Sequence, residues 1–236
     1  HVEVSAPDAL VYVDLGGSPR LAGRLWTRAR GSGQSASFEY DGDWIAAGYR
    51  FALEPALKVG PGPYHTAGRA LFSAIGDSAP DRWGRTLLAR RERLQAKEQG
   101  RAPRTLREID YLLGLSDFTR QGALRFKREE SGPFLLAPGW SLRGARPKAS
   151  GGSRSGGLLS AKYNRRDDDR DVGVWEGVAM KLAGMAGLNV ASWAVERVLG
   201  RTVLLLDRFD RHGETRIPFL SAMSMLEAVD VQPRSY

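Results

Sequence analysis

The first part of the chain alternates apolar and polar positions with a period of two, the spacing of residues that share one face of a β-strand. Residues 9–15, 21–26 and 36–44 show this alternation, and 51–55 is expected to form a short edge strand. Turn-forming residues at 16–19 separate the first two segments, as in a hairpin. The pattern therefore predicts a small antiparallel sheet in the N-terminal part.

Apolar spacing of three and four residues replaces this alternation after a Gly- and Pro-rich loop at 57–69. A helix is predicted over 80–100, with arginines opposite an apolar side made of Trp83, Leu87, Leu88 and Leu94. A second helix is predicted over 105–115, where Thr105 and Glu108 have the spacing of a capping box.

The second half of the chain follows a linker at 131–139 with Pro and Gly at both ends. A loop at 141–157 precedes the next strand, and a run of aspartates precedes a helix at 171–185. That helix is predicted to bury one apolar face, made of Val172, Trp175, Val178, Ala179, Leu182 and Met185. Short apolar stretches predict strands at 123–127, 158–163, 192–200 and 201–211.

Together these elements indicate an α+β fold, in which a small antiparallel β-rich subdomain is followed by a second α/β unit. The linker at 131–139 places the first domain at 1–130 and the second at 138–236. A length of 236 residues is sufficient for two small domains with real cores.

Composition narrows the function only partly. The chain carries a net charge of +8, which suits an anionic nucleotide, nucleic acid or an acidic partner. It has no cysteine, so disulfides and thiolate nucleophiles are excluded, and its three histidines lie far apart, which disfavours a histidine-rich metal site. Without an apolar run of membrane-spanning length or a signal-peptide pattern, the sequence favours a cytoplasmic protein with no membrane partner.

A lysine and a glutamate are the strongest candidates for chemistry. Lys162 lies in the otherwise apolar strand 158–163, where its ammonium group requires an anionic partner. Glu176 lies at the margin of the predicted apolar face of helix 171–185, from which it can reach across to that strand. Either residue alone is more simply explained as a surface charge. Together they predict a Lys–Glu pair that holds the ammonium against phosphate oxygens.

Two further groups support this prediction. The loop from Ser141 to Ser150 contains a central glycine and three cations, Arg143, Arg146 and Lys148, which suit a polyphosphate although no P-loop pattern is present. Arg208 and Asp210 are expected to pair across a turn and brace the fold, a structural role rather than a catalytic one.

The order of these parts resembles the HipA family of bacterial serine/threonine kinases, the toxins of type II toxin–antitoxin modules. The segments that carry the resemblance cover nearly the whole chain, at 72–91, 107–127, 141–150, 161–190 and 203–226. No single segment is specific, but the set in this order is. The resemblance implies a PI3K-like kinase N-lobe that binds ATP and Mg²⁺.

Residue by residue, the resemblance implies that Lys162 is the ATP-binding lysine and Glu176 its helix partner. The phosphate-binding loop corresponds to Gly144, Ala145, Arg146 and Lys148. Ser141 corresponds to the serine whose autophosphorylation silences family members, which would make this chain a phosphoprotein. The family phosphorylates aminoacyl-tRNA synthetases and is restrained by a HipB-like helix-turn-helix antitoxin, so DNA is reached only indirectly, through the antitoxin.

The resemblance also implies an absence. Catalytic and metal-binding residues of the family lie in a helical C-terminal lobe, which is expected to be absent because the sequence ends at Tyr236. Whether this chain is itself an enzyme therefore stays open. One alternative is a non-catalytic module that binds an antitoxin or a separate kinase chain. Direct DNA binding ranks last, since no predicted helix shows a helix-turn-helix pattern.

Overall fold

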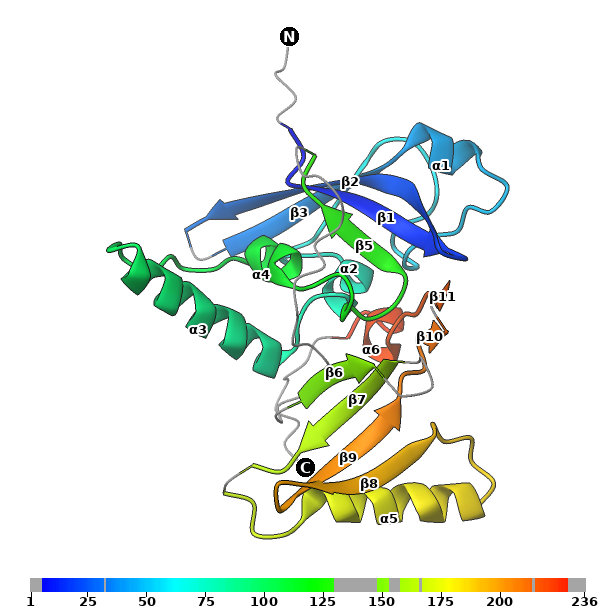
Figure 1. Ribbon diagram of the computed structural model, residues 1–236. Coiled ribbons are helices and arrows are strands. Elements are labelled where there is room, and N and C mark those ends of the chain that lie inside the picture. The colour runs from blue at the N-terminus through cyan, green and yellow to red at the C-terminus, as the bar shows by residue number, and fades with distance from the viewer. Residues whose placement is uncertain are drawn as a thin grey trace, which may run out of the picture.

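The computed structural model describes residues 6–31, 33–129, 148–152, 158–165, 167–213 and 215–228. Two antiparallel sheets dominate the fold and lie at opposite ends of the molecule, with short helices and a small hairpin between and around them (Figure 1). The expectation of an α+β chain built on antiparallel sheets is confirmed. In the described residues, no helix combines the length and the apolar character needed to cross a bilayer.

The N-terminal sheet has five strands in the order β4-β3-β2-β1-β5. Its strands are β1 (Ala9–Leu15), β2 (Ser18–Arg30), β3 (Gly33–Tyr40), β4 (Pro63–His65) and β5 (Leu124–Lys127). β5 joins from far along the chain and pairs with β1, so that Val11 lies opposite Phe126. Gly23 in β2 tolerates no side chain, because a Cβ there would lie 2.2 Å from the carbonyl oxygen of Glu39.

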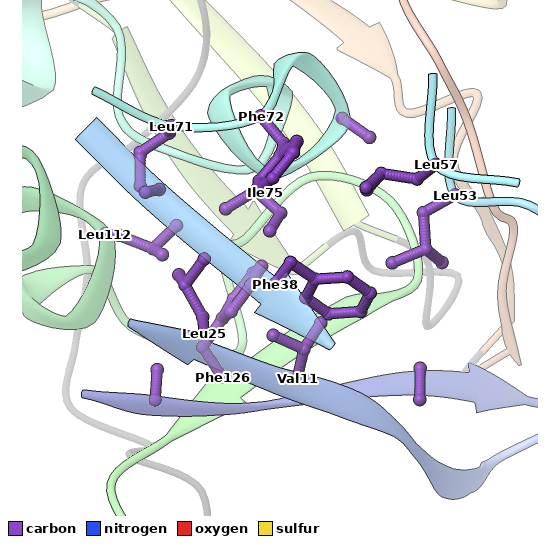
Figure 2. Packing of buried hydrophobic residues seen from close by; sticks show 14 of the residues in the cluster. Val11, Leu25, Phe38, Leu53, Leu57, Leu71, Phe72, Ile75, Leu112 and Phe126 are labelled. Carbon is purple, nitrogen blue, oxygen red and sulfur yellow. The ribbon is translucent and has the colours of Figure 1, made fainter. Parts of the chain in front are cut away.

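Apolar side chains from this sheet and from the helices form one core. The helices of this part are α1 (Gly42–Ala46), α2 (Ser73–Asp77), α3 (Arg82–Glu98) and α4 (Glu108–Gly114). Figure 2 shows Val11, Leu25 and Phe38 of the sheet facing Ile75 of α2 and Phe72, which directly precedes that helix. Phe38 is fully buried, and burial of such a side chain contributes about 1.5–3 kcal/mol. This core unites the N-terminal sheet and its helices in one packed part.

The second sheet has four strands in the order β6-β7-β9-β8, and one long helix covers one of its faces (Figure 1). Its elements are β6 (Lys148–Gly152), β7 (Leu158–Tyr163), α5 (Val172–Met185), β8 (Trp193–Val198) and β9 (Arg201–Asp207). In this sheet β9 occupies a central place between β7 and β8. The strand predicted at 158–163 is thus confirmed with the same bounds, and those predicted at 192–200 and 201–211 are confirmed with shorter ones.

The buried face of α5 is not the predicted one. Trp175, Leu182 and Met185 are 61%, 58% and 75% exposed, whereas Gly173 and Gly177 are buried against the sheet. A Cβ at position 177 would lie 3.0 Å from the Trp193 ring. The helix approaches the sheet through its glycines because they have no side chain, and this rotates the apolar face outward.

Three local predictions also fail. Residues 51–55 form no strand, and 36–44 divides into the end of β3 and the start of α1. Asp41 caps α1 by accepting the backbone N–H of Asp43, which ends the strand before the expected turn. The helix predicted to start at Thr105 begins at Glu108, where the Asp110 carboxylate accepts the backbone N–H of Arg107 at 2.9 Å.

The last described elements return to the N-terminal part. They are β10 (Arg211–His212), β11 (Thr215–Arg216) and α6 (Ala222–Met225), and they lie between the two sheets (Figure 1). The Asp77 carboxylate accepts the backbone N–H and the hydroxyl of Ser221 at 2.7 and 2.9 Å, which ties α6 to α2. The proposed domain limits at 130 and 138 fall outside the described residues, so the division at 1–130 and 138–236 stays a prediction.

Candidate functional site

Lys162 of β7 and Glu176 of α5 form an ion pair. The ammonium nitrogen donates to Glu176 Oε1 across the space between sheet and helix, although 14 positions separate the residues in sequence. Their side chains are 28% and 32% exposed, so the pair is open to solvent on one side. The contact predicted from the sequence is confirmed, and its role stays a prediction.

The close approach of α5 to the sheet creates this contact. Gly173 lies against Thr202 and Gly177 against Trp193 and Val195, and a Cβ on either glycine would meet these side chains at 3.0–3.3 Å. Glu176 lies between these two glycines in α5, three residues after Gly173, and its side chain therefore also reaches the sheet. A helix held away by larger side chains would leave the Glu176 carboxylate short of β7.

A polar network at the start of α5 fixes the helix against the end of β7. The Asp171 carboxylate caps α5 by accepting the backbone N–H of Val174 at 3.2 Å, and it accepts Asn164 Nδ2 at 2.7 Å. Asn164 Oδ1 accepts the backbone N–H of Gly173 at 3.0 Å, and the Thr202 hydroxyl donates to Asp171. The hydrogen bonds from Thr202 and Asn164 lower the pKa of Asp171, so this carboxyl stays ionised.

The sequence reasoning missed Asn164, Asp171 and Thr202. A signal was present, since Asp171 stands at the first position of the predicted helix, and an aspartate at a helix start is a common N-cap. The positions of Asn164 and Thr202 carried no such signal, because both become neighbours of Asp171 only when β7 and β9 pair. These three residues orient the helix that carries Glu176.

The electrostatics of the site favour an anion. The backbone of Lys148 lies opposite that of Lys162 in the β6–β7 register. An ammonium group has three donors, of which Glu176 takes one from Lys162, leaving donors for phosphate oxygens.

The remaining predicted site residues are not placed. Ser141, Gly144, Ala145 and Arg146 lie outside the described residues, and for Lys148 only the backbone position is described. Among the residues that the structure does describe, no group of three or more His, Asp or Glu side chains could hold a metal ion. The candidate site is therefore the Lys162–Glu176 pair with the start of α5.

The predicted pair of Arg208 and Asp210 is confirmed, and it extends further than expected. Arg208 Nε and Nη2 donate to the two Asp210 oxygens at 2.8 and 2.6 Å. Arg208 also donates to the carbonyl oxygens of Thr119 and Arg120, and Asp210 accepts the backbone N–H of Gly122 at 2.7 Å. This buried cluster joins the end of β9 to the N-terminal part, so it braces the base of the candidate site.

A cavity lies beside the start of α5. It has a volume of about 560 Å³ and is lined by Tyr163, Asn164, Arg165, Asp171, Arg197, Gly200, Arg201 and Thr202. Neither Lys162 nor Glu176 lines it, so the cavity is separate from the ion pair.

Comparison with known proteins covers both halves of the chain. The family described as HipA N-terminal domain matches residues 13–102, and the family described as HipA-like C-terminal domain matches residues 140–236. No curated protein sequence matches the chain.

Among solved structures, the chain is similar to HipA of Shewanella oneidensis MR-1, determined in a complex of that toxin–antitoxin system with HipB and its operator DNA. The identity is 16% and the TM-score 0.59, and the match covers 92% of this chain and 56% of the other. At this identity the similarity shows the fold alone. The chain spans little more than half the length of that relative.

Proposed function

Because the chain belongs to the HipA family of toxin–antitoxin proteins, we propose that it is the N-terminal portion of a serine/threonine protein kinase toxin. The complete kinase would transfer the γ-phosphoryl group of ATP to a serine or threonine hydroxyl of a target protein, with aminoacyl-tRNA synthetases as the target class. The second sheet with α5 would form its PI3K-like N-lobe, and a helical C-terminal lobe would supply the catalytic residues.

The observation that carries this proposal is the ion pair between a strand lysine and a helix glutamate. In protein kinases a Lys–Glu pair of this kind must be formed before the phosphates are held correctly. In this chain, Glu176 orients the Lys162 ammonium, and the network around Asp171 holds the helix that carries Glu176. A partly exposed pair of this kind contributes only about 0–1 kcal/mol to stability, which favours a role in binding over a role in folding.

The described residues fit the phosphates of ATP better than they fit a metal ion. ATP supplies the phosphoryl group and a chain of anionic oxygens, for which the donors of Lys162 are suited. No described cluster of acidic or histidine side chains could hold Mg²⁺, so the proposal assigns no metal ligand within the described ranges. Catalytic residues are likewise not assigned.

Regulation and partners follow the same proposal. A HipB-like antitoxin would bind the protein and connect it indirectly to DNA. Phosphorylation of Ser141 would add roughly −1.5 to −2 charges beside the basic residues of its loop. This charge would compete with the triphosphate for the same cations and silence the kinase.

Titration with a fluorescent ATP analogue tests the proposal on this chain. Lys162→Ala removes a charge-assisted contact of about 1.5–3 kcal/mol, so affinity should fall roughly 10- to 150-fold. Lys181→Ala is the matched control, because Lys181 is an exposed lysine of α5 with no described partner, and it should bind like the unmodified chain. Equal binding by all three proteins would refute the proposed site and favour the alternative, a non-catalytic module that binds an antitoxin or a kinase chain.

A further inference from the structure

The outer face of α3 carries a stripe of cations. Arg82, Arg90, Arg93 and Lys97 are all exposed, and steps of eight, three and four residues place them on one side of the helix. The opposite side packs on the protein through Gly84, Glu92 and Ala96, which are buried. With a rise of 1.5 Å per residue, the stripe is about 22 Å long.

Two acidic residues on or near this helix, Glu92 and Glu108, are paired with arginines outside the stripe. The Glu92 carboxylate points inward, where it accepts Arg101 Nη1 at 2.6 Å and the backbone N–H of Arg104 at 2.9 Å. The bond from Arg101, followed by that from Arg104, lowers the pKa of Glu92 to about 2, so this charge stays committed to them. Glu108 is likewise taken by Arg85, whose Nη2 donates to it at 2.6 Å.

The stripe itself has no such partners. Within the described ranges, Arg82, Arg90 and Lys97 make no ion pair, and the Arg93 side chain donates only to the carbonyl oxygen of Ala89, one turn earlier on α3. Glu98 is exposed and lies about 80° around the helix from Arg90 and about 100° from Lys97, so it borders one edge of the stripe. A continuous row of solvated cations therefore remains.

The shape of the row selects among anionic partners. A membrane-binding helix inserts a broad apolar face, and a stable protein interface needs an apolar centre, whereas this row contains neither. Single-stranded nucleic acids bind through stacked aromatic rings, which the row also lacks. A phosphate recurs about every 3.4 Å along each strand of duplex DNA, so about 22 Å corresponds to the axial length of roughly six phosphates.

We propose that, in addition to any indirect link through an antitoxin, this face of α3 binds the phosphate backbone of double-stranded DNA directly and without sequence preference. A straight helix fits beside the accessible grooves of B-form DNA, whereas the major groove of duplex RNA is deep and narrow. The proposal does not depend on the kinase assignment, since it involves neither Lys162 nor Glu176.

The salt dependence of the DNA affinity measures the number of contacts between cations and phosphates. Four phosphate contacts predict a slope of log K against log salt of about −3.6, because each contact contributes about −0.9. Binding of this chain to a labelled 20-base-pair duplex is followed by fluorescence anisotropy at several salt concentrations. The double variant Arg90→Ala/Arg93→Ala should reduce the magnitude of the slope by about 2. Circular dichroism checks that this variant and the control variant described below keep the fold.

The matched control is Arg197→Ala/Arg201→Ala, which removes the same net charge from exposed positions of β8 and β9 in the second sheet, away from α3 (Figure 1). Its slope should equal that of the unmodified chain. Equal losses in both double variants would show a net-charge effect without a site and would overturn the proposal. The same follows if the unmodified chain fails to bind duplex DNA at low salt, or binds duplex RNA or acidic vesicles more tightly.

Discussion

Asp210 is the residue at which a single substitution should loosen the joint between the two parts of the protein. Its side chain is fully buried and accepts four hydrogen bonds, two from Arg208, one from Arg211 and one from the backbone of Gly122. Asp210→Ala leaves two buried guanidinium groups without their carboxylate. Loss of one partner from a buried ion pair typically costs about 3–5 kcal/mol.

Chemical denaturation monitored by tryptophan fluorescence measures this loss. Since domains are stable by only about 5–15 kcal/mol, Asp210→Ala should remove a large fraction of the unfolding free energy. Asp207→Ala is the control: Asp207 lies three residues earlier, is exposed, and should change stability by less than about 0.5 kcal/mol. Asp210→Asn keeps the size of the side chain and an acceptor for Gly122, so its cost should lie between the two.

The pH dependence gives a second test of the same group. Burial by itself would raise the pKa of Asp210, but the hydrogen bonds and charges of Arg208 and Arg211 outweigh it, and the pKa is lowered. A lowered carboxyl pKa stabilises the fold above the unfolded value, about 3.9, and this contribution is lost as the pH falls through the folded pKa. Asp210→Asn should abolish that acid-dependent loss. If Asp210→Ala is as stable as Asp207→Ala, the ionic cluster does not join the two parts.

Two further predictions concern the N-terminal core and the outer surface of α5. The Tyr40 hydroxyl donates to the carbonyl oxygen of Leu57 and accepts the backbone N–H of Leu53, and burial raises the pKa of Tyr40 to about 12. The contribution of Tyr40 to stability should be complete below pH ~10 and lost as the pH rises towards 12. Tyr40→Phe should cost about 1–3 kcal/mol in urea unfolding and remove this alkaline transition. Trp175→Ala should change the unfolding free energy by less than about 0.5 kcal/mol, whereas Trp44→Ala, at a side chain only 1% exposed, should cost about 3–5 kcal/mol; a large cost at Trp175 would mean that the outer face of α5 is covered.

The local pattern of residues was sufficient to predict features that depend on one element or on elements adjacent in sequence. Most strands and the helices α3 and α5 follow from alternation, spacing and turn residues. The Lys162–Glu176 contact followed from a strand, a turn and a helix that are adjacent in sequence, which leaves few ways to arrange them. The Arg208–Asp210 pair was predictable for the same reason, since only two positions separate the residues.

The sequence pattern gave a wrong or incomplete prediction where the packing of elements, and not the hydrophobicity of a residue, decides which side chains are exposed. Hydrophobicity assigned the buried face of α5 to Trp175 and its neighbours, yet the helix packs through Gly173 and Gly177 because only glycine permits so close an approach to the sheet. The sequence pattern predicted only that the arginines of α3 lie opposite its apolar side. The structure shows that Glu92 and Glu108 pair with Arg101 and Arg85, which leaves the outer row of cations without their charges.

The amino-acid sequence alone determined the alternation of strands and helices, the antiparallel character of the sheets and the proximity of one lysine to one glutamate. These properties depend on neighbours within a few tens of residues, whose geometry the backbone restricts strongly. Tertiary structure alone decided that Asp210 reaches Gly122, 88 positions away in sequence, and that Thr202 supports the cap of α5. Such contacts depend on how whole elements pack, because many distant pairs have compatible chemistry and only the assembled fold selects among them.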